Sequence, residues 1–554
     1  MDRCVIDGNP DLKALRWVRG VCILGSIGLT LLVCALIIMR IDIPFDNEWV
    51  ESSIARSAQR VMDGESLYTP PSADYVGDNY PPLYFHLCAG LMYLFGPSLF
   101  VCRLVSVAAA AAVGLAIWMM GKRSSGDRWQ RRVIVGLFVA FYAAGGQTYD
   151  LARVDMTALA LAAWAIVTAV QSNGIRGAAI SGLLMAMAIL TKHNMLTVGA
   201  ALGLGLWVVE RRRGYAYAAL GFGLPVLVFG VLQILTDGWS GFYLFTQPAL
   251  HPFGGTGRWV RFIAEDVGNH GFLLAMGLGF GGMVLLRGGR WSADRRRTLL
   301  VLLVALGGLC ATMTGRLKAG GFSNNLVPAW AFGLMALAWM LPRVRKWGSI
   351  QSTEMAIRIA WGFWLITAVQ LSTLGSRFAD LPWSRTLAYA DRRNAADKLN
   401  ALVERYSDDS SVWMPWHSFN TGSSNHYAHL CPTGFLVDGA ERSAKSIFEA
   451  DLADHLRQRS WSVLILNDLS HGFVSDRCTQ LLKQGYEEVA FPIADPEILT
   501  MLTGKRTHPG RLFVRRNLSR ARQEAVGVHR EGTITRKQAA LLIAHFIDSA
   551  NPTR

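Results

Sequence analysis

Long apolar runs recur along the chain from Val21 to Leu374, and short polar or basic segments separate them. Most runs approach the ~20 residues with which an α-helix crosses the hydrocarbon core of a bilayer. The pattern predicts an all-α polytopic membrane protein with about 11–13 transmembrane helices. We expect helices near residues 21–39, 99–120, 133–148, 156–171, 174–190, 195–209, 215–235, 268–286, 298–314, 323–341 and 356–374.

The positions of the basic residues predict the topology, because cytoplasmic loops carry an excess of Lys and Arg. The basic clusters occupy segments 122–132, 211–213, 287–297 and 343–346. All of them fall on one side if the apolar segment 83–95, which is short for a span, lies in the interface without crossing. The expected divisions are a cytoplasmic N-terminus at 1–19, a membrane module at 20–383 and, within it, a first outer loop at 40–98.

The composition changes after residue 384. Short apolar stretches at 411–414, 463–466 and 512–514 read as strands, and helical patterns lie between them. We expect a small α/β soluble domain at 384–517, outside the cytoplasm because the number of spans is odd. A basic polar tail follows at 518–554.

The net charge of the chain does not change its interpretation as a membrane protein. The 554 residues are 51% hydrophobic and carry a formal net charge of +15. Such a charge on a soluble protein would suggest a nucleic-acid partner, but here the basic residues lie in loops between apolar runs. We therefore expect membrane lipids and no nucleic acid as partners.

The outer loops gather the polar residues that need an explanation. Asp46 and Glu48 follow the first span, where a carboxylate loses part of its hydration and is seldom kept without a role. The other candidate site residues in these loops are Tyr80, Arg153, Asp155, Lys192, His193, Arg258, Arg261, Arg316 and Lys318. Two alternatives stay open: Arg153 could pair with Asp150 or Asp155, and Lys192 could reach the interface as an ordinary lipid contact.

Five short motifs occur in order over roughly residues 20–375. They are Asp46-Asn47-Glu48-Trp49, the acidic segment 63–68, Tyr80-Pro81-Pro82-Leu83-Tyr84, segment 152–156 and segment 190–192. In this order they resemble the membrane-embedded glycosyltransferases of the C-type fold, which use polyprenyl-phosphate sugars. Within that group the chain is similar to bacterial relatives of protein O-mannosyltransferases and aminoarabinose transferases. One departure is that Asn47 separates two acids that are often adjacent in the family.

The resemblance implies a bacterial inner-membrane enzyme, a hexosyl- or pentosyltransferase. It would move a sugar from a polyprenyl-phosphate donor to a hydroxyl of a lipid, glycan or protein acceptor on the outer face. By resemblance, Asp46 is the general base of an inverting reaction, Glu48 orients a substrate, and the cations bind the lipid phosphate. No metal site is assigned, although Asp46, Glu48 and His86 leave a divalent metal open. The alternative function is a transporter or flippase of a lipid-linked substrate, which would not need the acids of the first outer loop.

Overall fold

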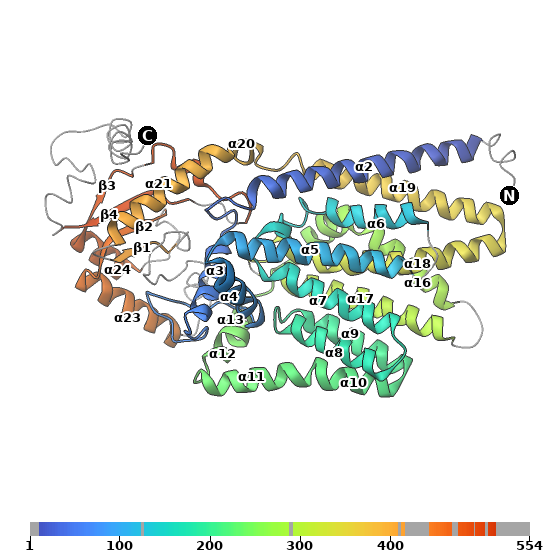
Figure 1. Cartoon of the computed structure of the whole chain (residues 1–554), viewed down its shortest axis with the longest axis horizontal. Coiled ribbons are helices and arrows are strands. Elements are labelled where there is room, and N and C mark those ends of the chain that lie inside the picture. Colours follow the sequence, from blue (N-terminus) through green and yellow to red (C-terminus); the bar gives the residue numbers. More distant parts are fainter. Residues whose placement is uncertain are drawn as a thin grey trace.

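The structure is a computed structural model. It describes residues 10–122, 127–286, 292–318, 320–407, 411–415, 442–467, 475–491, 493–504 and 508–516. Figure 1 shows a bundle of long, roughly parallel helices with a small sheet-containing domain at one end.

Within these residues, seven helical segments are long and apolar enough to cross a membrane. They contain α2 (Pro10–Arg40), α5 (Leu99–Lys122), α7 (Val154–Gln171), the consecutive α10 (Arg211–Gly221) and α11 (Gly223–Leu235), α17 (Ala293–Arg316), α18 (Val327–Gln351) and α19 (Thr353–Arg377). The shorter bundle helices are α6 (Arg128–Ala140), α8 (Ile175–Ile189), α9 (Met195–Val209) and α16 (Phe272–Leu286). These elements confirm the predicted polytopic α-helical fold, and each overlaps one of the expected helices. The expected helix 215–235 is divided into α10 and α11, and α6 ends at Ala140 instead of residue 148.

Helix α18 forms the centre of the bundle. Every residue from Val327 to Leu341 is buried, so this helix is apolar on all its faces. Around it, small residues allow close helix packing: a Cβ at Gly205 of α9 would lie 2.9 Å from the Leu300 backbone of α17. Helix α11 lies at the periphery and exposes apolar side chains, as expected for a surface in contact with lipid.

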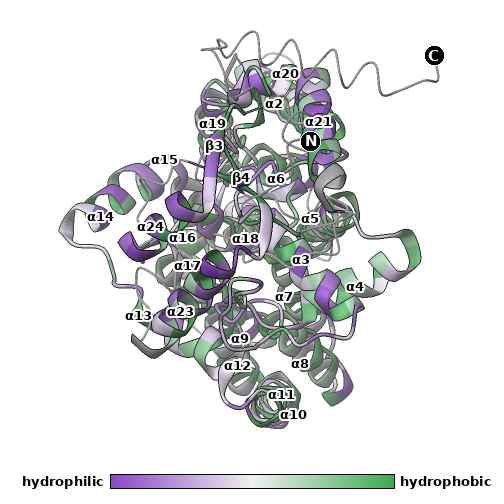
Figure 2. Cartoon of the chain, turned by 90° about the vertical axis from the view of Figure 1, so that its left-hand side faces the viewer, coloured by the Kyte–Doolittle hydropathy of each residue, from purple (hydrophilic) through white to green (hydrophobic). Residues whose placement is uncertain are grey.

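The first outer loop folds into two helices at the end of the bundle that carries the sheet. Helix α3 (Glu51–Met62) packs against α4 (Leu83–Phe95), and α4 lies beside α3 rather than along the long helices (Figure 1). The end of α4 exposes Tyr93, Leu94 and Phe95. In the view of Figure 2, α4 and α14 project from opposite sides of the molecule.

A second outer segment connects α11 to α16. It contains α12 (Trp239–Gly241), the π-helical η2 (Phe242–Thr246), α13 (Gln247–Leu250), α14 (Thr256–Arg261), the π-helical η3 (Phe262–Val267) and α15 (Gly268–His270). Two 3₁₀ turns, η1 (Thr148–Asp150) and η4 (Ser323–Leu326), precede α7 and α18. Segment η2 packs against the loop between α3 and α4, where the ring centroids of Tyr243 and Tyr68 lie 6.5 Å apart.

The C-terminal domain is a four-stranded mixed sheet with helices. The strands are β1 (Ser411–Trp413), β2 (Trp461–Leu466), β3 (Tyr486–Val489) and β4 (Arg511–Arg515), in the order β1-β2-β4-β3. β1 and β2 are parallel, and the other two pairs are antiparallel. The helices and turns are α20 (Trp383–Leu387), α21 (Tyr389–Ser407), α23 (Arg442–Gln458), α24 (Asp476–Gly485) and η6 (Pro496–Leu499).

Three of these strands lie where the sequence pattern predicts them. The sequence Tyr486-Glu487-Glu488-Val489 gave no strand signal, because two adjacent charged residues interrupt the apolar pattern. It forms β3 at the edge of the sheet, where charged side chains can reach solvent. The predicted tail at 518–554 lies outside the described residues.

The bundle geometry generates a prediction about the two sides of the membrane. Glu65 follows α3 at the end near the sheet, whereas Ser349 lies near the α18–α19 turn at the opposite end, beside the basic cluster 343–346. We expect an impermeant maleimide to label Glu65→Cys in intact bacterial spheroplasts and Ser349→Cys only after permeabilisation. The unsubstituted protein measures the background from exposed Cys34 and Cys310. Labelling of both variants from one side would contradict this topology.

Candidate functional site

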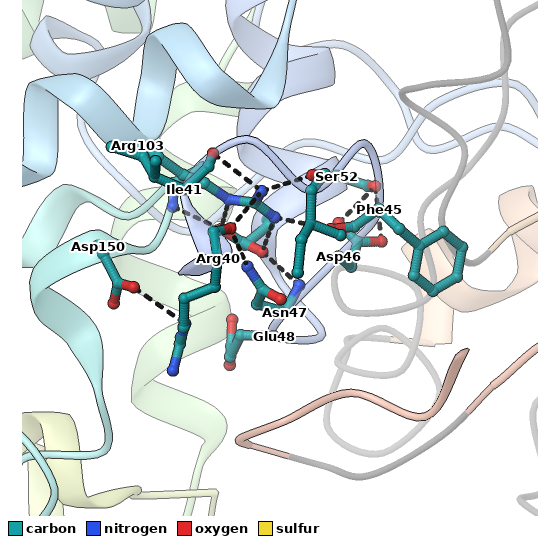
Figure 3. Close-up of polar contacts among 12 residues, drawn as sticks. Arg40, Ile41, Phe45, Asp46, Asn47, Glu48, Ser52, Arg103 and Asp150 are labelled. Carbon is teal, nitrogen blue, oxygen red and sulfur yellow. Dashed lines mark hydrogen bonds and ion pairs between the residues drawn. The ribbon is translucent and has the colours of Figure 1, made fainter. Parts of the chain in front are cut away.

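A buried ion pair anchors the first outer loop to the bundle. Arg103 of α5 is fully buried, and its Nε and Nη2 donate to the two carboxylate oxygens of Glu51 at 2.8 and 2.7 Å. The same guanidinium donates to the carbonyl oxygens of Ile43 and Phe45, each at 2.7 Å (Figure 3). One side chain thus fixes the chain between the end of α2 and the start of α3, where the acidic motif lies.

Glu51 extends this anchor to the start of α7. Its carboxylate also accepts from the backbone N–H of Asn47 at 2.6 Å and of Ala152 at 2.8 Å. Burial by itself would raise the pKa of Glu51, but the charge and hydrogen bonds of Arg103 outweigh it and lower the pKa. Glu51 is therefore a charged structural residue that joins the acidic motif to the segment carrying Arg153.

The two acids of the motif have different surroundings. Both carboxylate oxygens of Asp46 accept from the Ser52 hydroxyl, at 2.8 and 2.7 Å (Figure 3). Glu48 instead accepts from Nη1 of Arg153 and from the backbone N–H of Val50, each at 2.9 Å. Burial, partly offset by Arg153, raises the pKa of Glu48 to about 7.

Arg153 and Lys192 share a carboxylate partner. Asp155 accepts from Nε of Arg153 at 2.9 Å and from Nζ of Lys192 at 2.7 Å. The amide of Asn324, from η4, donates to the same carboxylate at 2.9 Å. The open question for Arg153 is thereby answered: it pairs with Asp155 and Glu48, while Asp150 pairs with Arg40 at 2.9 Å.

A cavity of about 450 Å³ lies against this network. It is lined by Trp49, Val50, Asp78, Asn79, Tyr80, Arg153, Lys192, His193, Asn194, Leu196, Thr197, Pro248, His251, Phe253, Thr314, Gly315, Lys318, Gly320, Gly321, Phe322, Asn324 and Asn325. Segments far apart in the sequence therefore meet around one space. Most of them belong to loops that we predicted to be outside, and the ends of α9 and α17 add Leu196, Thr197 and Thr314.

Asp78 is a third acid at this cavity. Its carboxylate accepts from the hydroxyls of Ser53 and Ser57, each at 2.7 Å, and burial raises its pKa to about 6. Asp78 was not among the residues predicted from the sequence. The signal was its position just before the Asn79-Tyr80-Pro81-Pro82 motif, two residues from a candidate that we did select.

Several buried polar atoms at the cavity wall lack a partner among the described residues. They are Nε1 of Trp49, Oδ1 of Asn79, Nδ1 of His193, and both side-chain polar atoms of Asn194. Burial, together with the charges of Lys192 and Lys318, lowers the pKa of His193 to about 4, so its ring is neutral near pH 7. Buried polar groups normally have partners, so these atoms indicate where a polar ligand would bind.

Of the candidate residues, the structure brings Tyr80, Arg153, Lys192, His193 and Lys318 to the cavity, and Glu48 and Asp155 contact them. Tyr80 accepts from Nη2 of Arg153 at 3.3 Å through its hydroxyl. Asp46 is outside this lining.

The remaining cations have other partners or positions. Arg316 pairs with Asp266 at 2.7 Å, and Arg258 donates to the Lys318 carbonyl. Arg261 is exposed on α14 and does not line the cavity. Arg258 and Arg316 are thus close to the site only through the loops that they hold, and phosphate binding by these three residues stays a prediction.

Within the described residues, no three His, Cys, Asp or Glu side chains converge in a way that could hold a metal ion. His86 accompanies neither Asp46 nor Glu48, because its Nδ1 bonds the Pro82 carbonyl of the preceding turn at 2.9 Å.

Comparisons with known proteins fit this architecture. Residues 79–232 match the family described as dolichyl-phosphate-mannose-protein mannosyltransferase. The apo crystal structure of ArnT from Cupriavidus metallidurans is similar with a TM-score of 0.50 at 13% identity, over 88% of this chain and 96% of that one. AglB from Archaeoglobus fulgidus, solved with an inhibitory peptide and a dolichol-phosphate, gives a TM-score of 0.47 at 10% identity, over 84% of this chain and 73% of that one. No curated protein sequence matches the chain.

The family match and the shared ArnT fold confirm the resemblance drawn from the sequence. The chain is a polytopic membrane protein that shares the fold of ArnT, and the matched family region covers residues 79–232. The family match begins at Asn79 and includes Arg153 and Lys192 of the cavity, so it covers part of the site as well as part of the bundle.

The buried anchor predicts a large effect of one substitution. Arg103→Met leaves Glu51 charged and unpaired in the interior, and breaking such a pair typically costs about 3–5 kcal/mol. We expect a large drop in the thermal unfolding midpoint in detergent. Arg358→Gln is the control, because Arg358 and its partner Glu354 are both exposed and such pairs contribute about 0–1 kcal/mol. Equal midpoints for the two variants would refute the anchoring role.

Proposed function

We propose that the chain transfers a sugar from a polyprenyl-phosphate donor to an acceptor hydroxyl, at the outer face of a bacterial inner membrane. The observation that carries the proposal is a cavity that combines buried acids, paired cations and unpartnered polar atoms. A transfer reaction needs all three: a proton acceptor, a positive environment for the leaving phosphate, and groups that orient the sugar.

The cations at the cavity suit a lipid phosphate. Lys192 and Arg153 are both held by Asp155, while Lys318 lies across the cavity and donates to the Pro248 carbonyl at 2.9 Å. These interactions fix the cations before a substrate arrives. Preorganised charges stabilise a developing phosphate anion without a further reorganisation cost.

Glu48 is the acid that the geometry favours as the proton acceptor. In the proposed step, the acceptor oxygen bonds to the anomeric carbon while the bond from that carbon to the phosphate oxygen breaks. The phosphate leaves with the electron pair, and the hydroxyl proton passes to Glu48. Attack opposite the leaving group inverts the anomeric configuration. A pKa of about 7 suits a general base, which works best near the ambient pH.

Asp46, the base expected from the sequence, stays the competing assignment. Its carboxylate binds Ser52, whereas Glu48 binds Arg153 of the cavity wall. This contact is why Glu48 is preferred, although neither acid lines the cavity itself. Asp78 lines the cavity and is a second competitor. The unpartnered atoms of Asn79, His193 and Asn194 are suited to binding sugar hydroxyls, and the edge-to-face pair of Trp49 with Phe322, at 5.7 Å, offers an apolar wall.

A transporter of a lipid-linked substrate is the second candidate function. The same cations would serve it, but it would not require a carboxylate with a raised pKa beside them. Transfer requires a carboxylate that accepts a proton and transport does not, so substitution of the acids distinguishes the two functions.

Comparing three acid variants tests the assignment. In membranes supplied with a panel of radiolabelled polyprenyl-phosphate sugars, we expect Glu48→Gln to lower transfer about 10²–10⁴-fold, the usual contribution of a positioned base. Asp46→Asn and Asp78→Asn should retain more transfer. Donor binding should persist in Glu48→Gln, because Arg153 and Lys192 remain. A dominant loss in Asp46→Asn or Asp78→Asn would move the base to that residue, and movement of the lipid-linked sugar across vesicles without transfer would favour a transporter.

The pH dependence of turnover provides a second test. A base must be deprotonated, so the rate should fall as the pH drops through the pKa of Glu48, near 7. If Asp78 were the base, the fall would lie near pH 6. The residual rate of Glu48→Gln should lack the limb near pH 7. Persistence of this limb in Glu48→Gln would show that another group titrates.

A further inference from the structure

We propose that the C-terminal domain is a working part of the catalytic site: its segment Thr500–Gly504 holds the backbone of the acidic motif and positions the Glu48 carboxylate. The claim that this segment positions Glu48 for catalysis rests on the proposed function. The contact between the two segments does not depend on the proposed function.

The backbone contacts join the two segments directly. The N–H groups of Leu502 and Thr503 both donate to the Asn47 carbonyl, at 2.9 and 3.2 Å. Glu48 and Thr503 form an isolated parallel β-bridge. A pairing of this kind fixes the backbone direction of both segments and hence the direction in which the Glu48 side chain leaves its backbone.

Two side chains of the C-terminal domain strengthen this contact. Arg392 of α21 is fully buried and donates to the Thr500 carbonyl at 2.8 Å and to the Asp46 carbonyl at 3.5 Å. The Thr503 hydroxyl donates to the Gly146 carbonyl at 3.1 Å, just before the η1 turn. The segment is thus tied to the acidic motif through Arg392 and to the chain before η1 through Thr503.

Gly504 lies directly against the side chain of Glu48. Its φ is +74°, and a Cβ at this position would lie 2.7 Å from Oε1 of Glu48 and 2.6 Å from Cδ1 of Trp49. Oε1 is the same oxygen that accepts from Arg153. A methyl group here must therefore move either the segment or the Glu48–Arg153 pair, and Trp49, which lines the cavity, moves with it.

A matched control separates this contact from backbone strain. Gly64 lies in the first outer loop, has a φ of +80°, and a Cβ there would meet nothing within 4 Å. An alanine at either glycine adopts the same unfavourable φ region. Only Gly504→Ala adds a methyl group beside Glu48.

The experiment compares Gly504→Ala with Gly64→Ala in the full chain. We expect Gly504→Ala to lower kcat for sugar transfer about 10–100-fold, since small misplacements of a reacting group have effects of this size. The KM for the polyprenyl-phosphate sugar should change little. The acid limb of the kcat profile should move to higher pH, because a weaker pairing with Arg153 favours protonated Glu48. Gly64→Ala should leave kcat and the limb near the wild-type values.

A second measurement keeps the contact testable without activity. Hydrogen–deuterium exchange should speed up in peptides covering 41–52 and 500–504 in Gly504→Ala, but not in Gly64→Ala. If Gly504→Ala does not fold, Thr503→Val removes only the bond to Gly146 and should lower kcat more modestly.

The outcomes separate the two proposals. Wild-type transfer with equal kcat and equal pH limbs for the two glycine variants would overturn the positioning role and leave the proposed function standing. A wild type that transfers no sugar would overturn the proposed function and the catalytic role of the contact together. Faster exchange in Gly504→Ala would still support the contact, and unchanged exchange would overturn it.

Discussion

The structure of the site depends on one buried guanidinium. Arg103 can donate five N–H groups, and it uses them on Glu51 and on carbonyl oxygens of the loop that follows α2. Ile43 and Phe45 are buried in the protein and cannot rely on water to satisfy their backbone, so an internal donor with several N–H groups replaces it. Because Glu51 also binds the backbone of Asn47 and Ala152, this single pair sets the distance between the acidic motif and Arg153.

The second constraint is charge balance around the cavity. Glu48 and Asp155 face Arg153 and Lys192, so no member of this group is buried without an opposite charge. Unpaired charges would be costly at this depth, and pairing lets the site hold cations for a phosphate before the substrate binds. The pKa of Asp78 is raised because its carboxylate is buried and bonded to the neutral hydroxyls of Ser53 and Ser57. The pKa of Glu48 is raised because burial outweighs its ion pair with Arg153. The C-terminal domain adds backbone contacts to the same acidic motif, so the site is built from both parts of the chain.

Much of the fold could be predicted from the sequence, because apolar length and the spacing of basic clusters carry direct physical meaning in a membrane protein. Each expected helix has a counterpart, and three of four strands lie in predicted stretches. The site was harder to predict. Tyr80, Arg153, Lys192, His193 and Lys318 could be selected because polar residues beside apolar runs are conspicuous. Asp78 and Asn194 were missed, because one acid or amide in a polar loop looks like any other until its neighbours are known.

The sequence by itself determined that the chain is a polytopic helical membrane protein with a small sheet-containing C-terminal region, and which loops hold unusual charge. These are local properties, set by the free energy of transferring apolar and charged side chains into a bilayer. Only the tertiary structure decided that Asp46 turns to Ser52, that Glu48 meets Arg153, and that Gly504 lies against Glu48. Such contacts join residues up to several hundred positions apart, and the direction of a carboxylate depends on backbone anchors that no local pattern encodes.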